Sequence, residues 1–231
     1  MGTRPVSHRV EVFVGPFGSG KTEVALNRAL SLVRAGTSVP SVPSVTFIDL
    51  DVVDPYFRAR DARATLEAAG VRFVAPAPEW DSVDLPLLTT QMLALPPEGR
   101  LLIDAGGEAH GALVLRQLGR LLPADAAIYL VVNPYRPFMR TPERIDVARR
   151  RLETAGGVAI TALIANPHLS LATTPEVIQS GFHIVREASL QMRLPVAWTA
   201  VAADLVGKVD LPGEILPLVF HMLPPWELEV A

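Results

Sequence analysis

Residues Gly15 to Thr22 read GPFGSGKT and fit the pattern G-x-x-x-x-G-K-[ST], whose backbone N–H groups hold phosphate oxygens. The glycines allow a tight turn, and the helix expected after it adds its positive N-terminal end. In this pattern Lys21 reaches the outer phosphates, and Thr22 offers a hydroxyl to Mg²⁺. A glycine-rich turn can match by accident, but here a β-branched strand precedes the turn and an amphipathic helix follows it. We predict a nucleotide site with the binding residues Gly15, Phe17, Gly18, Ser19, Gly20, Lys21, Thr22 and Glu23.

A pair of carboxylates ends the second expected strand, in the segment FIDLD from Phe47 to Asp51. The carboxyl ends of parallel strands face the ligand crevice of an open α/β sheet. Asp49 and Asp51 point the same way in an extended segment, because side chains alternate with a period of two. Two such acids repel each other unless a cation or water separates them, and Mg²⁺ with its retained waters fits there. We predict a Mg²⁺-binding or water-positioning role; the alternative is that both acids cap the next helix.

A third acid ends the aliphatic segment LLIDAGGE, Leu101 to Glu108. A hydrophobic strand that ends in aspartate after a phosphate loop is the Walker B arrangement, which holds Mg²⁺ directly or through water. Asp104 is therefore a predicted metal residue. Gly106 and Gly107 allow the chain to change course with the nucleotide state, as a switch requires.

Recognition of the base rests on one polar residue at the end of a later strand. Asn166 has an amide suited to an adenine edge, although asparagine before proline is also common in simple turns. No N-K-x-D follows, which disfavours a guanine-specific site. Trp198 and Val201 are candidates to flank a purine ring, but Trp198 is expected more readily in the core. We assign Asn166 to the nucleotide.

Strand-like and helix-like segments alternate along the chain, which predicts βαβ units. The strands are nearly all apolar, as expected when helices cover both faces of a parallel sheet. We predict an α/β fold of the three-layer P-loop NTPase type, a mostly parallel central sheet with helices on both faces. The expected strands are Val10–Val14, Val45–Leu50, Val71–Ala75, Leu101–Asp104, Ala127–Val132, Ala159–Ala165 and Val196–Val201.

The expected helices have recognisable ends. Thr22–Ala35 and Arg58–Ala69 each stop at a glycine, which favours a helix C-terminus. Thr141 and Thr174 each precede Pro-Glu, as an N-cap precedes a first-turn proline and an acid.

We predict a single domain over residues 1–231, in which 210–231 is a C-terminal packing tail. The apolar part of this tail, Ile215–Leu223, is interrupted by Pro217 and is expected to pack on the core or on a partner chain.

Composition limits the classes of function. The 231 residues carry a net charge of −3 and contain no cysteine. The acidic balance argues against a nucleic-acid partner, and the lack of cysteine excludes disulfides and thiolate metal sites. No signal-peptide core or membrane-spanning segment is apparent, so we expect a cytoplasmic protein with no membrane partner.

Taken in order, GxxxxGKT, IDLD, LLIDAGG and an Asn-ending strand resemble the MinD/ParA/CobQ group of SIMIBI-type P-loop nucleotide-binding proteins, over roughly the first 200 residues. Within that group the strings GPFGSGKTEVALN and IDLDVVDPYFRAR are similar to an ATP-binding subset of unassigned role. The resemblance implies ATP and Mg²⁺ as ligands. It assigns Lys21 to the phosphates, Thr22 and Asp104 to the metal, Asp51 to the attacking water and Asp49 to a metal-water contact.

The chain departs from this family at one position. Many members have a lysine just after the first loop glycine, which reaches across a nucleotide sandwich dimer, and here that residue is Pro16. A substitute cation must come from elsewhere, and Arg58 and Arg60 lie in the expected first switch region. Our hypothesis is that one of them contacts the γ-phosphate or a partner subunit; the alternative is the exposed first turn of a helix.

The function expected from these observations is a slow, Mg²⁺-dependent ATPase that acts as a nucleotide-gated switch, as a homodimer with an unidentified protein partner. Three alternatives stay open. They are a small-molecule ligase or kinase of the dethiobiotin synthetase type, an accessory ATPase in metallocofactor maturation, and a binding module that no longer hydrolyses ATP.

Overall fold

The computed structural model describes residues 8–36, 44–50, 59–75, 99–106 and 109–221. A single eight-stranded sheet runs in the order β3-β2-β4-β1-β5-β6-β7-β8, and every neighbouring pair of strands is parallel. The strands are β1 (Val10–Val14), β2 (Val45–Leu50), β3 (Val71–Val74), β4 (Arg100–Ala105), β5 (Ala127–Val132), β6 (Ala162–Ala165), β7 (Val196–Ala202) and β8 (Ile215–Leu218). The helices are α1 (Lys21–Ala35), α2 (Arg63–Ala68), α3 (Ala109–Leu118), α4 (Pro142–Gly156) and α5 (Pro175–Met192), with 3₁₀ turns η1 (Ala59–Ala62) and η3 (Ala203–Lys208).

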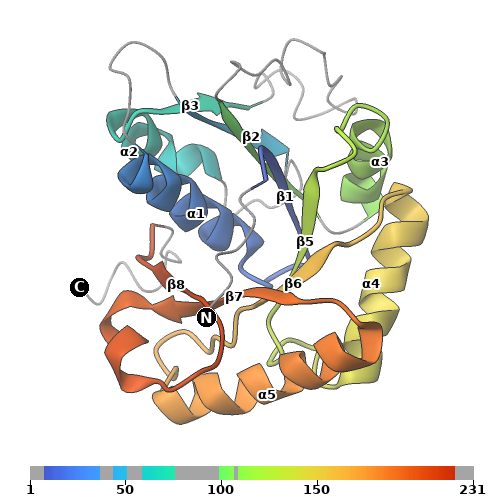
Figure 1. Ribbon diagram of the computed structural model, residues 1–231, viewed down its shortest axis with the longest axis vertical. Helices are drawn as coiled ribbons and strands as arrows, with labels where there is room; N and C mark the ends of the chain where they lie inside the picture. Colours follow the sequence, from blue (N-terminus) through green and yellow to red (C-terminus); the bar gives the residue numbers. More distant parts are fainter. Residues whose placement is uncertain (1–7, 37–43, 51–58, 76–98, 107–108, 222–231) are drawn as a thin grey trace.

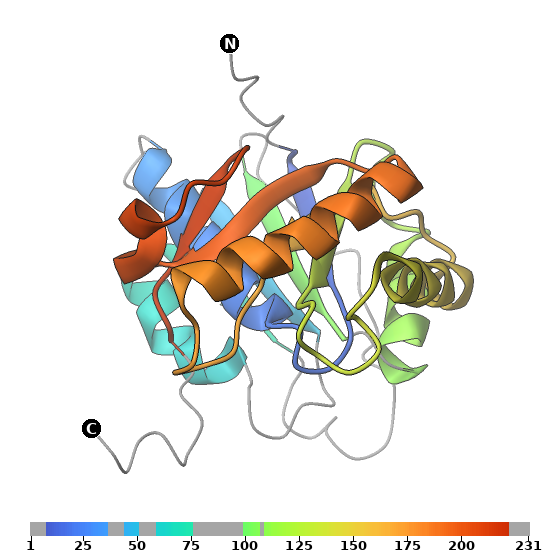
Figure 2. The same cartoon turned by 90° about the horizontal axis from the view of Figure 1, so that it is seen from below.

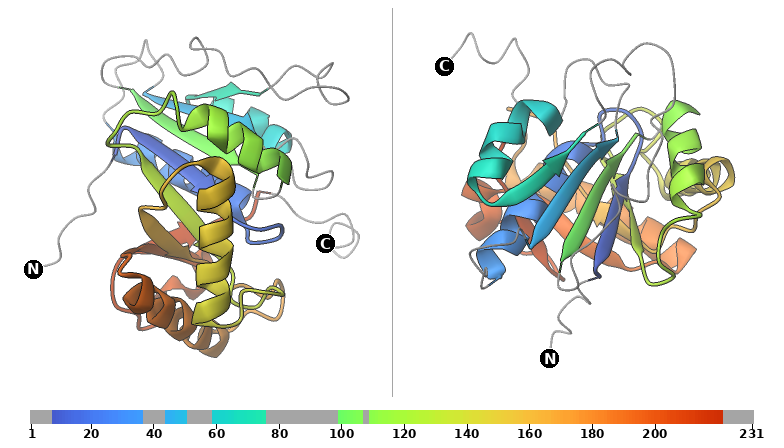
Figure 3. Two further views of the ribbon diagram at one scale, coloured as in Figure 1. Left: turned by 90° about the vertical axis from the view of Figure 1, so that its right-hand side faces the viewer. Right: turned by 90° about the horizontal axis from the view of Figure 1, so that it is seen from above.

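Helices cover both faces of this sheet, which gives three layers (Figure 1). α1 and α2 pack on one face, and α3, α4 and α5 pack on the other, as the left view in Figure 3 shows for α3 and α4. α5 lies along β6 and β7 (Figure 2). The predicted α/β architecture is therefore confirmed. None of the helices in the described ranges is long and apolar enough to cross a bilayer.

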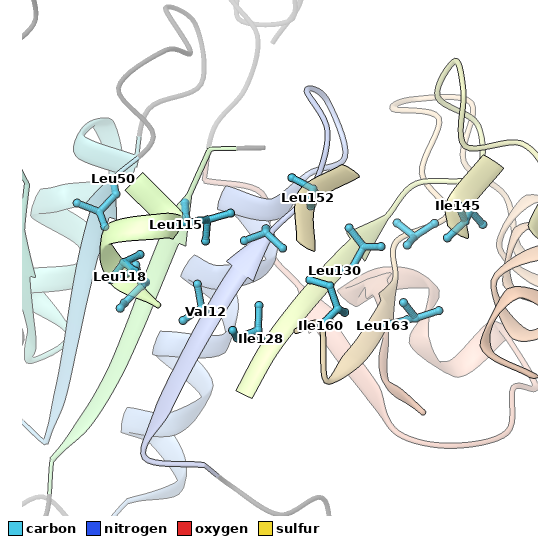
Figure 4. Close-up of a cluster of buried hydrophobic side chains, with 14 of the residues drawn as sticks. Val12, Leu50, Leu115, Leu118, Ile128, Leu130, Ile145, Leu152, Ile160 and Leu163 are labelled. Carbon is cyan, nitrogen blue, oxygen red and sulfur yellow. The ribbon is translucent and has the colours of Figure 1, made fainter. Parts of the chain in front are cut away.

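The core has two halves because the strands are apolar on both faces. One half lies between the sheet and α3, α4 and α5, with Val12, Leu130 and Leu163 on the strands and Leu115 and Leu152 on the helices (Figure 4). The other half lies under α1 and α2. Strand residues on both faces are fully buried, which is the arrangement that the continuous apolar runs predict.

The eighth strand was not predicted as a strand. β8 contains Pro217, which has no N–H for a sheet ladder and interrupts the apolar pattern. The proline is tolerated because β8 is the edge of the sheet and pairs on one side only, with β7. Leu216 and Leu218 of β8 are buried in the core, and residues 222–231 lie outside the described ranges, so the packing of the whole tail stays a prediction.

The starts of two other elements differ from the sequence prediction by more than one residue. The helix expected from Arg58 begins as a 3₁₀ turn at Ala59 and becomes α-helical only at Arg63. The sixth strand begins at Ala162, because the Thr161 hydroxyl accepts the Ile128 N–H at 2.9 Å in place of a strand carbonyl. The two predicted threonine caps are confirmed: Thr141 and Thr174 accept backbone N–H groups at the starts of α4 and α5.

A buried ion pair fixes α1 against the sheet. Arg28 donates Nε to Glu11 Oε2 at 2.9 Å and Nη2 to Glu11 Oε1 at 2.8 Å, and the Glu11 side chain is 1% exposed. The guanidinium carbon also lies 4.4 Å from the centre of the Trp198 ring. Burial, and then the Glu11 charge, raise the pKa of the neighbouring Tyr129. The position of α1, and of the loop before it, depends on this contact with β1.

Replacing Arg28 with alanine leaves the Glu11 carboxylate buried without its counter-charge. We expect the free energy of unfolding, measured by urea denaturation at pH 7, to fall by about 3–5 kcal/mol. The control is Arg150→Ala, which removes a 70% exposed partner of Asp146 and should cost about 0.5 kcal/mol or less. Equal losses in the two variants would show that the Glu11–Arg28 pair does not anchor α1.

Candidate functional site

The loop from Gly15 to Gly20 turns sharply between β1 and α1. The Ser19 N–H donates to the Pro16 carbonyl at 3.0 Å, which closes a four-residue turn. Gly18, third in this turn, has φ 71°, and Gly20, just before α1, has φ 82°. Both angles lie in the left-handed region that glycine adopts without strain, so the loop glycines are required by the backbone path.

Two of the loop glycines also lack room for a side chain. A Cβ on Gly15 would lie 2.6 Å from Ser19 Oγ and 2.7 Å from the Val131 carbonyl oxygen. A Cβ on Gly20 would lie 2.3 Å from Asn166 Nδ2. The loop is therefore packed tightly against the ends of the neighbouring strands β5 and β6.

The start of α1 is polar and unusually buried. Ser19, Lys21 and Thr22 are at most 5% exposed. In contrast to α4 and α5, no side chain caps the N-terminus of α1, where Gly20 is the N-cap residue. The Ser19 hydroxyl is buried and finds no hydrogen-bond partner within the described residues. Uncapped N–H groups, the helix dipole and a lysine at one point favour a bound anion.

Asp49 and Asp104 lie side by side beneath this helix start. They are directly paired across β2 and β4, which Figure 3 shows as neighbours in its right-hand view, and each is at most 1% exposed. Asp104 also pairs with Phe13 on β1, whose side chain packs under α1, so both acids face the α1 side of the sheet. The structure therefore brings these two predicted metal residues to the same face as Lys21 and Thr22.

The donor set at this point suits a hard divalent cation. Two carboxylates and the Thr22 hydroxyl are oxygen ligands of the kind that Mg²⁺ prefers. No group of three or more His, Cys, Asp or Glu side chains gathers to hold a metal ion in the described ranges, so this site offers two carboxylates and a hydroxyl. Asp51, the predicted water-positioning residue, and Gly107 lie outside the described residues.

Asn166 supports the loop from the end of β6. Its Nδ2 donates to the Ser19 carbonyl oxygen at 2.7 Å, and the side chain is 5% exposed. The peptide between Ser19 and Gly20 is planar and trans, so its N–H points opposite to its carbonyl. Because Asn166 holds the Ser19 carbonyl pointing away from the loop, the Gly20 N–H points into the loop. The predicted contact of Asn166 with an adenine edge stays a prediction, but its amide nitrogen is already engaged.

Arg136 is a site residue that the sequence reasoning missed. It follows β5, and its Nε donates to the Gly18 carbonyl oxygen at 2.8 Å. The segments after β5 and β6 are joined to each other, because Asn133 Nδ2 donates to the His168 carbonyl oxygen at 2.8 Å. The repeat of Asn-Pro at the ends of both strands, at Asn133 and Asn166, indicates two similar turns but does not single out Arg136.

Glu23 faces away from the loop, toward the C-terminal segment. Its Oε1 accepts the His221 N–H at 2.8 Å, and Asn27 exchanges two hydrogen bonds with the backbone of Val219 at 2.8 and 3.0 Å. Burial, with the Arg34 charge, lowers the pKa of His221. Any contact of Glu23 with a nucleotide therefore depends on its backbone, because its carboxylate binds the segment after β8.

The remaining candidates divide into core and surface. Trp198 and Val201 are 3% and 1% exposed, and Trp198 packs edge-on against Tyr129, so both belong to the core and neither flanks a ligand. The Phe17 side chain is 56% exposed at the outer side of the loop. Arg58 lies outside the described residues, and the structure places only the backbone of Arg60, in η1. The hypothesis about these two arginines stays a prediction.

Solved structures share this fold at low sequence identity. The signal recognition particle receptor FtsY from Elizabethkingia anophelis matches with a TM-score of 0.54 at 20% identity over 93% of this chain. Chloroplast FtsY from Physcomitrella patens and cell division protein FtsY from Thermotoga maritima each match with a TM-score of 0.54 at 15% identity over 86% of this chain. Another structure of the Elizabethkingia receptor, in complex with GDP, matches with a TM-score of 0.51.

These matches establish the fold of the chain. The chain covers only 63%, 60% and 64% of the three FtsY chains. No protein-family model and no curated protein sequence matches it. The structure is an α/β fold of the P-loop NTPase type, as the sequence predicted, with the phosphate-loop pattern at the turn between β1 and α1.

The crowding at Gly20 gives a direct test of the loop. We expect Gly20→Ala to weaken nucleotide binding about tenfold or more, because the new methyl group displaces Asn166 from the Ser19 carbonyl. The control is Gly70→Ala, whose φ of 88° imposes the same backbone strain, about 1–2 kcal/mol, with no atom within 4 Å of the added Cβ. Calorimetric titration with Mg-ATP checks both, and equal affinities would refute the role of this contact.

Proposed function

We propose that this chain binds a purine nucleoside triphosphate, ATP, together with Mg²⁺, and hydrolyses it slowly. The observation that supports this most strongly is the convergence of four groups. Buried Lys21 and Thr22, at the uncapped start of α1, face the same side of the sheet as the paired carboxylates of Asp49 and Asp104. A cation, N–H groups and metal ligands at one point are what a triphosphate with its divalent ion requires.

The chain's own groups account for most of the proposed chemistry. The loop N–H groups and Lys21 stabilise the charge that develops on the phosphate oxygens. Thr22, Asp104 and Asp49 are the residues that would hold Mg²⁺, which neutralises charge on the outer phosphates when bound. In hydrolysis a water oxygen bonds to the γ-phosphorus and the bond to the bridging oxygen breaks, which yields ADP and phosphate. Asp51 is our proposed residue for orienting that water.

Slow hydrolysis suits a switch, in which the nucleotide state alters contacts with a protein partner. We infer a cytoplasmic homodimer of the MinD/ParA/CobQ kind, but without the family's lysine, because Pro16 occupies that position. GDP in one structure of the same fold makes guanine nucleotides the competing ligand class. Phosphate release without any added substrate supports the switch. Strict dependence on a carboxylate or hydroxyl substrate would favour the ligase alternative.

Lys21→Ala tests the phosphate site. We expect the affinity for Mg-ATP to fall about 10- to 100-fold, the range for a hydrogen bond to a charged group. Lys208→Ala, which removes an exposed lysine from η3, is the matched control and should bind as the wild type does. Calorimetry measures both variants.

Asp104→Asn tests the metal site. It should bind nucleotide more weakly than the wild type with Mg²⁺ and equally well with EDTA, because only the metal contact is lost. A wild-type chain that gives no Mg²⁺-dependent heat with any purine triphosphate would refute the proposed function.

A further inference from the structure

The sheet order gives the phosphate loop two different sides. β4 and β2, which carry Asp104 and Asp49, lie on one side of β1. β5 and β6, which lead to Arg136 and Asn166, lie on the other side. Asp104 and Asp49 would hold the Mg²⁺ that neutralises charge on the outer phosphates of a triphosphate. A triphosphate bound at the loop would therefore have its outer end toward β4 and β2 and its nucleoside end toward β5 and β6.

Arg136 lies on the side of the loop where we expect the nucleoside, and only one of its three guanidinium nitrogens is hydrogen-bonded within the described residues. Only its Nε is engaged, with the Gly18 carbonyl oxygen at 2.8 Å. Neither Nη group has a hydrogen-bond or ion-pair partner in the described part of the chain, and the residue is exposed. A Cβ on Gly18 would lie 3.1 Å from Arg136 Nε, so the guanidinium rests directly on the loop. A planar cation held in this way is exposed and keeps N–H donors available for a ligand.

The segment that carries Arg136 is held rigidly. The Arg136 N–H donates to the Asn133 carbonyl and the Met139 N–H donates to the Arg136 carbonyl, both at 3.1 Å, and Met139 is buried. Phe138 has φ 66°, a left-handed conformation that strains a residue with a bulky side chain. Such strain persists only where the surroundings impose it, and it is common at ligand-binding sites.

α5 supports this segment from behind. A Cβ on Gly181 would lie 2.5 Å from Pro167 Cβ and 3.0 Å from both Pro134 Cγ and Tyr135 Cε2. The glycine therefore lets α5 pack directly on the segments after both β5 and β6. These segments place Arg136 and Asn166 on consecutive carbonyl groups of the phosphate loop. The arginine is in place before any ligand arrives.

We propose that the Arg136 guanidinium is the stacking platform for the purine base of the bound nucleotide. This inference rests on the proposed function. A guanidinium plane stacks on aromatic faces, and stacking does not distinguish one base from another, because every base has a π-face. Such a platform supplies base affinity in a chain that lacks N-K-x-D. It predicts that adenine and guanine nucleotides depend on Arg136 to the same extent.

The test separates the base from the phosphates by using tripolyphosphate, which has no base. Titrations with Mg-ATP, Mg-GTP and Mg-tripolyphosphate are compared for the wild type, Arg136→Ala and Arg136→Lys. We expect Arg136→Ala to weaken both nucleotides roughly 5- to 100-fold, the range for loss of base stacking, and to change tripolyphosphate affinity less than twofold. Arg136→Lys keeps the charge but loses the plane, so it should lose most of the same affinity.

Two controls define the outcomes. Arg140→Ala removes a second exposed arginine from the same segment and should leave all three affinities unchanged. Asn166→Ala disturbs the loop itself and should weaken tripolyphosphate as well as the nucleotides.

Three results would overturn the platform. They are equal loss of tripolyphosphate and nucleotide affinity in Arg136→Ala, no loss at all in that variant, and wild-type affinities in Arg136→Lys. Failure of the wild-type chain to bind any of the three ligands is a different result, which would refute the proposed function instead.

Discussion

The site depends on the direction of the peptide groups in the phosphate loop. Two consecutive carbonyl groups, of Gly18 and Ser19, are held by side chains from outside, at 2.8 and 2.7 Å. Since a trans peptide directs its N–H opposite to its carbonyl, holding the Ser19 carbonyl fixes the aim of the Gly20 N–H. A loop with positive φ at two glycines has many other conformations available when it is free. Asn166 therefore fixes a loop N–H that is open to an anion, which lowers the conformational entropy that anion binding would cost. The peptide that Arg136 holds has its N–H, that of Ser19, already bonded to the Pro16 carbonyl.

Burial of charge at this point lowers the stability of the folded chain. Lys21, Asp49 and Asp104 are almost fully buried, and ionised groups lose much solvation when they leave water. The apolar halves of the core on both faces of the sheet supply the stability that such a site needs. The bidentate Glu11–Arg28 pair holds α1, and with it Lys21 and Thr22, at a fixed distance from the carboxylates on β2 and β4.

Local patterns in the sequence were sufficient to predict the sheet and to select the loop, Asp49 and Asp104 as candidates. Each depends on residues close together in the chain or on the rule that parallel strands end at the same edge. The pairing of Asp49 with Asp104 was not predicted, because the sequence pairs Asp49 with Asp51. Arg136 could not be predicted in this way, because its contact with Gly18 spans 118 positions and the segment after β5 reads only as a turn. β8 was missed for a local reason, since Pro217 breaks a strand pattern that only an edge position permits. The support that Asn166 gives to Ser19 likewise follows from topology and not from its neighbours in sequence.

The first two turns of α1 make contacts in two directions. Lys21 and Thr22 face the phosphate loop, while Glu23 and Asn27 bind the backbone of Val219 and His221. A helix is rigid over so short a length, so a displacement at its start would also displace the segment after β8. The same displacement would be resisted by the ion pair between Arg28 and β1. The phosphate loop, the edge strand β8 and the segment after it are thus all in contact with α1. In the function proposed above, α1 is the element through which phosphate occupancy would act on that segment.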